Sequence, residues 1–292
     1  MIHRSVCRAA LSLLMMTAMG IFACSPEQKA LLPGAAKVPA INAEALNSIV
    51  DASFGGLGTC LTITDRATGA EVYVYGSNTA CMRPLPPCST FKIANSLIGL
   101  DEGVIKSDEV IKWDGKPQAL KSWEIDANLE MAFKRSMVPW FQRVARQIGP
   151  ETYAKRLKAM DYGSRDPAGP VDQFWLGPEV GGGLTISTRQ QTQFLNRLYA
   201  DRLSSNPLTT ATVAKIMIDE TRGASVMSGK TGTCSSQADG SRNVGWWVGR
   251  LNSPERDLVF AVSMEGQNAL PGRELQIRLK SAFAQAGLWP QG

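Results

Sequence analysis

Strand-like segments near both ends of the 292-residue chain, separated by a long helix-rich stretch, constrain the fold most strongly. A hairpin pattern covers residues 58–76, and helical patterns dominate residues 105–205. Three further strand-like runs follow, at residues 225–228, 244–249 and 258–263. Short helices are expected over 90–102 and 273–287. This order predicts an α/β fold of the α+β type, with an antiparallel sheet flanked by helices plus a helical subdomain.

The composition is that of an ordinary soluble domain with a mildly basic surface. Hydrophobic residues make up 44% of the chain, charged residues 20%, and the formal net charge is +5. No basic run or basic–aromatic stripe accompanies this charge, so we expect no nucleic-acid partner.

The chain contains a single histidine, His3. Loss of the N-terminus would leave no histidine at all, which excludes a Ser-His-Asp triad, a Cys-His dyad and a histidine-ligated zinc site. We therefore expect no metal. Acid–base chemistry near neutral pH must come from another side chain whose pKa is shifted.

A positively charged start and a short apolar segment indicate export. Arg4 and Arg8 flank the beginning of residues 9–23, which are mostly apolar but too few to span a bilayer comfortably. We expect residues 1–23 to be a signal peptide and the mature chain to be periplasmic. The alternative is a buried N-terminal helix.

The next segment is expected to connect the signal peptide to the folded protein. Residues 24–44 fit a tether or a loosely packed lead-in, which leaves residues 45–292 as one domain. Residues 21–24 also resemble a bacterial lipoprotein box, in which Cys24 would carry a lipid anchor to the outer membrane. Phe22 is atypical of such a box, so lipidated and unlipidated N-termini both remain open.

Four cysteines lie beyond the signal region, and an exported chain favours disulfides between them. Three pairings are possible. Cys60 and Cys81 flank the predicted hairpin, whose ends lie close together, so this pair is favoured. That choice leaves Cys88 and Cys234, either paired or as two free thiols.

Three short motifs contain side chains suited to nucleophilic chemistry. Ser89 and Lys92 have i, i+3 spacing, which places both on one face of the predicted helix. Lys230-Thr231-Gly232 lies in a strand-like context, and Ser136 lies two residues before Val138. Taken singly, the first motif also fits a helix-capping serine with a surface lysine, and the second fits a solvated turn.

The order Ser-x-x-Lys, Ser-x-Val, Lys-Thr-Gly resembles the class D β-lactamases, or oxacillinases. The resemblance covers residues 55–288 and includes further stretches: Lys112-Trp113-Asp114-Gly115, Phe174-Trp175-Leu176, Gly245-Trp246-Trp247-Val248-Gly249 and Leu270-Pro271-Gly272-Arg273. It implies the fold of penicillin-recognising serine β-lactamases and transpeptidases. It also implies hydrolysis of β-lactam antibiotics, and thus antibiotic resistance.

The resemblance also implies a role for each matching residue. Ser89 would be the acylated nucleophile, and Lys92 would react with CO2 to form a carbamate, N6-carboxylysine, that acts as general base. Ser136 would relay protons, and Lys230 would set the local potential. The remaining matches would bind substrate or line the site: Val138, Trp175, Leu176, Thr231, Gly232, Thr233 and Arg273.

Several of these roles carry an alternative. Trp175 would donate its indole N–H to the carbamate, although it also fits a plain core aromatic. Backbone N–H groups of Ser89 and Thr233 would form an oxyanion hole. Arg273 would pair with the substrate carboxylate, with Arg278 as the alternative because the residues around Arg273 differ from the family pattern.

The chain departs from the family pattern at three places. Ser164 follows Tyr162-Gly163 where the family has asparagine, so a loop contact is expected to be lost. The glycine-rich loop over residues 177–184 is longer than expected, and its glycines predict mobility. Cysteines directly before the serine and four residues after Lys230 occur in class A carbapenem-hydrolysing enzymes, which resemble this chain in fold. This placement predicts a Cys88–Cys234 disulfide.

No cofactor is expected beyond CO2 or bicarbonate for the lysine carbamate. Two other functions remain as alternatives: a cell-wall transpeptidase or carboxypeptidase inhibited by β-lactams, and a covalent β-lactam sensor domain. Val138 and Trp175 argue against the first, and the lone apolar segment argues against the second. The sequence leaves substrate preference and oligomeric state open.

Overall fold

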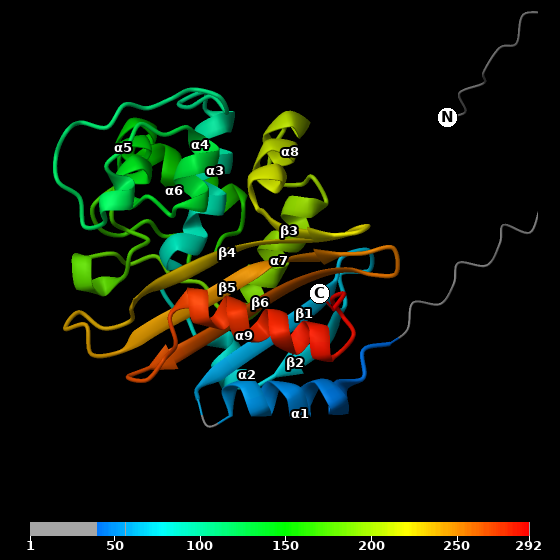
Figure 1. Cartoon of the computed structure of the whole chain (residues 1–292). Helices are drawn as coiled ribbons and strands as arrows, with labels where there is room; N and C mark the ends of the chain where they lie inside the picture. The colour runs from blue at the N-terminus through cyan, green and yellow to red at the C-terminus, as the bar shows by residue number, and fades with distance from the viewer. Residues whose placement is uncertain (1–39, 56, 292) are drawn as a thin grey trace, which may run out of the picture. The chain divides into compact units, whose positions relative to one another are not determined.

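The computed structural model describes residues 40–55 and 57–291, and within them the chain folds around a six-stranded antiparallel sheet (Figure 1). The strand order is β2-β1-β6-β5-β4-β3. The strands are β1 (Thr59–Asp65), β2 (Glu71–Tyr75), β3 (Ile218–Arg222), β4 (Ser225–Ser235), β5 (Asn243–Asn252) and β6 (Asp257–Gly266). The predicted signal peptide and Cys24 lie outside the described residues.

The predicted antiparallel sheet with flanking helices is confirmed, but one strand was missed, and each of the three strands predicted after the helix-rich stretch was too short. The missed strand, β3, has the sequence IDETR and pairs with the start of β4 at the edge of the sheet. The strand predicted over residues 225–228 continues to Ser235 because β5 pairs with it along its whole length. The Lys-Thr-Gly motif therefore lies within a strand.

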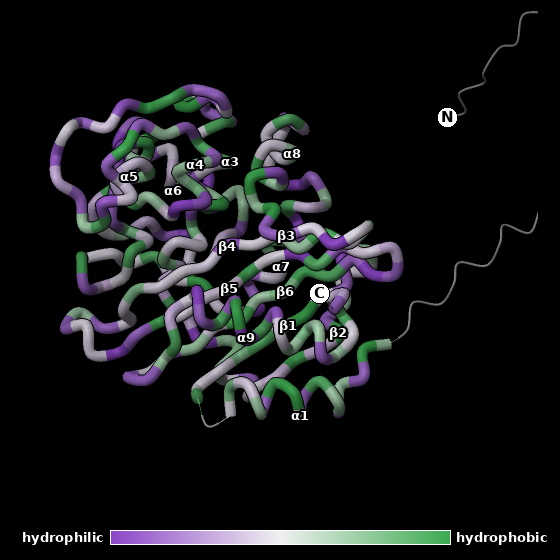
Figure 2. The backbone as a smooth tube through the Cα atoms, in the orientation of Figure 1, coloured by the Kyte–Doolittle hydropathy of each residue, from purple (hydrophilic) through white to green (hydrophobic). Residues whose placement is uncertain are grey.

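Adjacent tryptophans on β5 show how the sheet separates two cores. Successive strand residues point to opposite faces, so Trp246 and Trp247 enter different clusters. The Trp246 side packs against the helices of the middle of the chain, and the Trp247 side packs under the first and last helices. Figure 2 colours each residue by hydropathy and shows apolar positions along α1 and the strands of the sheet.

Helices cover both faces of the sheet. They are α1 (Ala43–Phe54), α2 (Asn78–Met82), α3 (Lys92–Asp101), α4 (Leu129–Lys134), α5 (Val138–Ile148), α6 (Pro150–Ala159), α7 (Thr188–Tyr199), α8 (Pro207–Ile216) and α9 (Gly272–Gln285). Three short 3-10 turns accompany them: η1 (Cys88–Phe91), η2 (Lys121–Trp123) and η3 (Pro178–Val180). None of the described helices is long and apolar enough to cross a bilayer.

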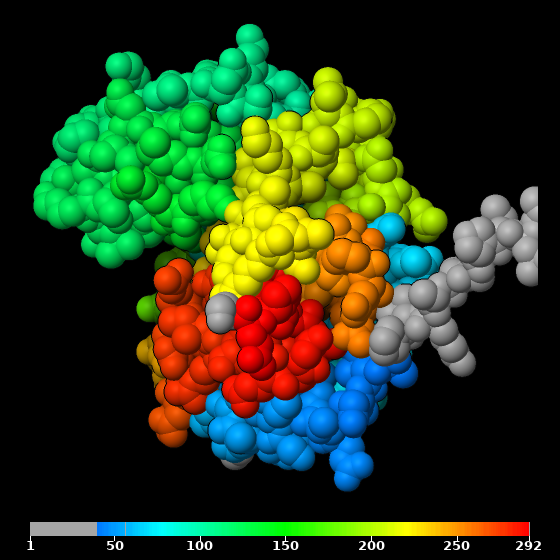
Figure 3. Space-filling model, turned by 45° about the vertical axis from the view of Figure 1, so that its right-hand side comes forward, coloured from blue at the N-terminus to red at the C-terminus, as the bar shows by residue number. Residues whose placement is uncertain are grey.

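The first helix corrects the predicted end of the tether. The α1 helix begins at Ala43, because the Asn42 side chain accepts a hydrogen bond from the Ala45 N–H and caps the helix. Leu46, Val50 and Phe54 lie one turn apart and are buried. This apolar stripe packs α1 beside α9, as the blue and red surfaces in Figure 3 show.

The helix-rich stretch predicted over residues 105–205 divides into two parts. The α4, α5 and α6 helices cluster with α3 beside the sheet (Figure 1), whereas α7 packs directly on β1 and β6. The α7 helix begins at a capping box in which Ser187 and Gln190 satisfy each other's backbone N–H groups. The α8 helix, beyond the predicted boundary, packs on α3, so the helical part extends to Ile216.

Candidate active site

Ser89 lies in a tightly held turn between a proline pair and α3. The sequence predicted it at the start of an α-helix, and the structure places it in the 3-10 turn η1, which continues into α3. Cys88 has a left-handed φ of 51°, a strained conformation for a residue other than glycine. The Pro87 carbonyl accepts hydrogen bonds from the Thr90 N–H at 3.1 Å and the Thr90 hydroxyl at 2.6 Å. These contacts fix the turn that presents the half-buried Ser89 hydroxyl.

The Lys92 amine lies beside this hydroxyl. Its Nζ is 2.8 Å from Ser89 Oγ and 5.4 Å from the centre of the Phe141 ring, and the side chain is fully buried. Burial, and secondarily the charge of Lys230, lowers the pKa of Lys92 well below its ordinary value. The surroundings therefore favour a neutral amine, which can take a proton or attack an electrophile.

Trp175 places an unpaired donor in the buried core cluster that also contains Phe91 and Phe141. Its ring stacks on Phe91 with centroids 5.4 Å apart and planes inclined by 26°, and it is fully buried. Among the described residues, nothing accepts a hydrogen bond from its indole Nε1. A buried donor without a partner costs about 1–3 kcal/mol. Leu176 and Val138, predicted beside it as site residues, are both half-buried.

A second serine–lysine pair joins the connection between α4 and α5 to the sheet. Lys230 Nζ donates to Ser136 Oγ and to the Thr231 carbonyl, each at 3.0 Å. Lys230 is buried, and this burial, followed by the charge of Lys134, lowers its pKa to about 7. Ser136 also has a left-handed φ, of 53°. The charge of Lys230 acts on Lys92, so the two pairs form one site.

The glycine of the Lys-Thr-Gly motif lets β4 lie directly against η1. A Cβ at Gly232 would lie 3.1 Å from the Pro87 carbonyl oxygen and 3.2 Å from the Thr90 methyl group. A side chain here would push the strand away from the nucleophile turn. Thr231 and Thr233, on either side of Gly232, thereby lie on the strand that borders Ser89.

The start of α9 meets the same strand and brings Arg273 to it. The Gly272 N–H donates to the Thr233 hydroxyl at 2.9 Å, and a Cβ at Gly272 would lie 2.5 Å from the Gly232 carbonyl oxygen. Only a residue without a side chain allows the start of α9 to lie this close to β4. Arg273 is exposed next to it, whereas Arg278 pairs with Glu274 and donates to the backbone of α1. The structure thus favours Arg273 over Arg278 as a residue near the site.

Both expected disulfides are present. Cys60 and Cys81 join the end of α2 to β1, with Cα atoms 5.2 Å apart. Cys88 and Cys234 join the residue before Ser89 to β4, with Cα atoms 5.7 Å apart. The second bond therefore links the nucleophile turn covalently to the Lys-Thr-Gly strand.

One predicted consequence of the loop sequences differs from what the structure shows. The Ser164 hydroxyl accepts a hydrogen bond from the Thr185 N–H at 3.3 Å, so serine still makes a loop contact where the family has asparagine. The glycines after Trp175 permit close backbone approach: a Cβ at Gly177 would lie 2.5 Å from the Ser235 carbonyl oxygen, and one at Gly182 would lie 2.6 Å from that of Gln173. The mobility expected of this loop stays a prediction.

Sequence reasoning missed residues that support the nucleophile from behind. The ring of Phe141 lies next to the Lys92 amine, but its helical spacing indicated only a core position. Gln191 is fully buried on α7 and donates to the Thr90 hydroxyl at 2.8 Å, and Trp246 donates to the Pro86 carbonyl at 2.9 Å. No local pattern identifies such partners, because they come from distant segments.

Comparisons with known proteins agree with this geometry. The family model described as the penicillin binding protein transpeptidase domain matches residues 59–283. The chain is 35% identical to β-lactamase OXA-10 of Pseudomonas aeruginosa over 228 residues, which cover 78% of this chain and 79% of that one. It is 41% identical to β-lactamase OXA-48 of Klebsiella pneumoniae over 180 residues, 61% of this chain and 65% of that one.

A solved structure extends the comparison to three dimensions. The class D β-lactamase from Nostoc superposes with a TM-score of 0.72 at 32% identity, covering 84% of this chain and 99% of that one. The fold and the two serine–lysine pairs define a penicillin-recognising serine enzyme of the transpeptidase-like class. Within that class, the chain belongs to the class D β-lactamase family.

Proposed function

We propose that this protein hydrolyses the amide bond of β-lactam antibiotics through an acyl-enzyme on Ser89. One observation carries the proposal: a fully buried lysine amine lies 2.8 Å from a serine hydroxyl that a tightly bonded turn presents. No described residue near this hydroxyl is a histidine, because the chain's one histidine is His3. Lys92 is then the base that a serine nucleophile requires.

The reaction proceeds in two halves. The Ser89 Oγ attacks the lactam carbonyl carbon and gives up its proton to the base at Lys92, and the carbon–nitrogen bond of the ring breaks. The proton that the base took from Ser89 passes through Ser136, which is hydrogen-bonded to Lys230, to the leaving nitrogen, so the base is free again. Water then attacks the ester carbonyl and gives a proton to the base, and the Ser89 oxygen leaves with a proton.

The residues around Lys92 fit a carboxylated lysine. Burial lowers the pKa of Lys92 and so favours the neutral amine that attack on CO2 requires, and the Trp175 Nε1 is a buried donor with no acceptor among the described residues. A carbamate on Lys92 would supply a carboxylate base for both halves of the reaction. Trp175 would hold it by donating its indole N–H, and the apolar rings of Phe91 and Phe141 would keep water from it.

The Lys-Thr-Gly strand and the start of α9 would bind the substrate. Thr231 would donate its hydroxyl to the substrate carboxylate, and the exposed Arg273 would pair with that group. Backbone N–H groups of Ser89 and Thr233 would stabilise the oxyanion, a contribution of about 2.7–4 kcal/mol for each donor. The contact at Gly232 supports this assignment, because it keeps the strand against the nucleophile turn.

Turnover of a chromogenic cephalosporin, with and without added bicarbonate, tests the proposal. We expect steady turnover that rises with bicarbonate after the buffer has been degassed. A single stoichiometric burst without turnover would contradict it and would favour a β-lactam-inhibited transpeptidase or a covalent sensor.

We further propose that the protein acts in the periplasm after export. The support is the N-terminal sequence: a basic start followed by a short apolar segment. Mass spectrometry of the mature N-terminus tests this proposal. A chain that begins at Cys24 with added lipid mass indicates a membrane anchor, one that begins there without it indicates a free exported protein, and an uncleaved Met1 contradicts export.

A further inference from the structure

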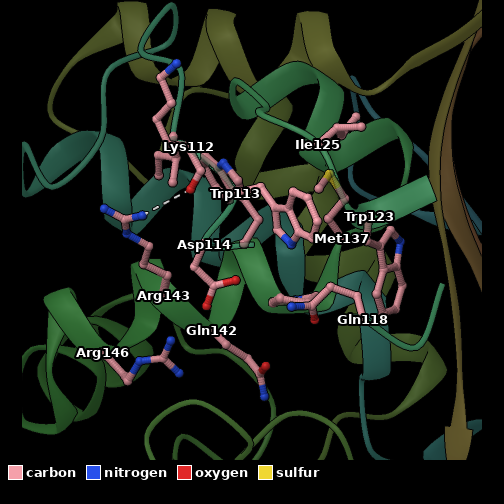
Figure 4. Close-up of a pocket in the computed structure, with 13 residues that line it drawn as sticks. Lys112, Trp113, Asp114, Gln118, Trp123, Ile125, Met137, Gln142, Arg143 and Arg146 are labelled. Atoms are coloured by element: carbon pink, nitrogen blue, oxygen red, sulfur yellow. Dashed lines mark hydrogen bonds between the residues drawn. The ribbon is translucent and has the colours of Figure 1, made fainter. Parts of the chain in front are cut away.

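A cavity of about 230 Å³ lies between the α3–α4 connection and α5, separate from the Ser89 site (Figure 4). Its wall includes Met137 and Pro139, on either side of Val138, but none of the four residues of the two serine–lysine pairs. The cavity is therefore distinct from the Ser89 site and lies next to the segment that contains Ser136 and Val138.

Three tryptophans give this cavity an aromatic wall. Each indole N–H is already satisfied by a backbone carbonyl: Trp113 donates to Lys116 at 2.9 Å, Trp123 to Arg135 at 3.0 Å, and Trp140 to Ala127 at 2.9 Å. An occupant would therefore meet the rings as apolar surface. The aromatic wall favours a flat apolar group.

The charged residues of the wall leave one cation available. Lys112 pairs with Asp126 at 3.1 Å, and Arg146 pairs with Asp172. Asp114 is the acidic residue of the wall, and its Oδ2 lies 3.9 Å from the Lys116 Nζ.

Arg143 differs from these residues because no carboxylate among the described residues pairs with it. Its polar contact within the described chain is the Lys112 carbonyl at 3.4 Å, which is long for a hydrogen bond. Figure 4 shows its guanidinium group at the cavity beside Lys112 and Asp114. A planar guanidinium with free N–H groups suits a carboxylate, which it can bind with two hydrogen bonds.

We propose that this cavity binds an aromatic or other flat apolar carboxylate, with its ring against the tryptophans and its carboxylate on Arg143. The site is separate from the one that recognises the carboxylate of a β-lactam. The proposal does not depend on the proposed hydrolysis, because the cavity wall contains neither of the two serine–lysine pairs.

Calorimetric titration of the full chain with 2-naphthoate tests the proposal. We expect one site, and a dissociation constant that rises about tenfold or more in Arg143→Met, which removes the charge-assisted hydrogen bonds. Arg143→Lys, which keeps the charge, should recover part of the affinity. Arg202→Met removes an exposed arginine elsewhere and should leave the affinity unchanged.

Two further controls separate this cavity from the Ser89 site. The neutral analogue 2-naphthylmethanol should bind wild type about as weakly as 2-naphthoate binds Arg143→Met. Arg273→Met should bind 2-naphthoate like wild type. Unchanged affinity in Arg143→Met, loss of binding in Arg273→Met, or no binding to wild type would each overturn the proposal. Cephalosporin turnover by Arg143→Met, measured alongside, reports separately on the proposed function.

Discussion

The two serine–lysine pairs of the site use the same residue types in different surroundings. Lys92 and Ser89 are one helical turn apart. The fully buried Lys92 amine lies 5.4 Å from the centre of the Phe141 ring, and no backbone carbonyl of the described residues accepts a hydrogen bond from it. Lys230 comes from β4 and Ser136 from the connection between α4 and α5. Lys230 also lies over a ring, 5.7 Å from the centre of Phe133, but it donates to the Thr231 carbonyl as well. A backbone acceptor can anchor a charged amine, whereas an apolar pocket favours a neutral one.

The difference suggests separate tasks for the two lysines. The enclosed amine of Lys92 suits attack on CO2 and service as a base, and the unpaired Trp175 donor lies in the same buried cluster. The anchored amine of Lys230 suits proton transfer through Ser136. Spacing along the chain is therefore less informative than what surrounds each amine.

The largest effect is expected from loss of the Lys92 amine. Lys92→Ala should lower turnover of a chromogenic cephalosporin by about 10²–10⁴-fold, because it removes the general base. Ser89 should still acylate slowly, so mass spectrometry should find a persistent acyl-enzyme. Full activity in this variant would exclude Lys92 as the base.

The next largest effects are expected from the two disulfides. Cys88–Cys234 borders the serine–lysine pairs, and Cys60–Cys81 joins α2 to β1. The Cys88–Cys234 bond spans 146 residues and the Cys60–Cys81 bond spans 21. Chain entropy predicts losses of about 5 and about 3 kcal/mol of unfolding free energy when each is replaced by two serines. Only the first replacement should also lower turnover in the folded protein, because it frees the Ser89 turn from β4. Equal turnover in both double variants would contradict a role for Cys88–Cys234 in bracing the site.

The Ser136–Lys230 pair should behave as one unit. Ser136→Ala and Lys230→Ala should each lower turnover by about 10²-fold, since each interrupts the same proton transfer. The double variant should lose little more than either single variant. Additive losses would show that the two residues act independently.

A smaller effect on binding separates the two candidate arginines. Arg273→Ala should raise the KM for a penicillin by about 10- to 100-fold through loss of a charge-assisted pair. Arg278→Ala is the matched control, and because it pairs with Glu274 on α9 it should change KM little. A larger rise in KM for Arg278→Ala than for Arg273→Ala would indicate that the substrate carboxylate binds at Arg278.

The smallest expected effect is the dependence of stability on pH. Lys230 loses its proton near pH 7 in the folded chain and near 10.5 in the unfolded chain. Between these values the unfolded chain binds more protons, so Lys230 should make the unfolding free energy rise with pH by about 1.4 kcal/mol per unit. Denaturant titrations at pH 7, 8 and 9 should show this slope in wild type relative to Lys230→Met. If the unfolding free energies of wild type and Lys230→Met change with pH in parallel, the lowered pKa of Lys230 is contradicted.

The sequence predicted those features that depend on local pattern. Alternation identified the hairpin and three central strands, and the i, i+3 spacing of Ser89 and Lys92 predicted their contact. The strand β3 was missed because its own sequence is polar and lacks a strand pattern. Its pairing with β4 makes it a strand. The α1 helix was not predicted, although its apolar stripe is regular and only its first two residues fall in the predicted lead-in.

Contacts made by distant segments could not be predicted in this way. Phe141, Gln191 and Trp246 support the nucleophile turn from α5, α7 and β5, and their own sequences indicate only core positions. The positive φ of Cys88 likewise follows from packing around the turn. The roles of Trp175 and Arg273 remain predictions based on the resemblance and are supported by their positions.

Carbon-13 NMR of the protein equilibrated with ¹³C-bicarbonate tests the central claim most directly, that a neutral Lys92 takes up CO2 and serves as the base. We predict one carbamate resonance per active site, which is lost in Lys92→Ala and on acidification, and whose intensity follows cephalosporin turnover as bicarbonate is varied. Absence of the resonance in a sample that turns over cephalosporin at full rate would contradict the claim.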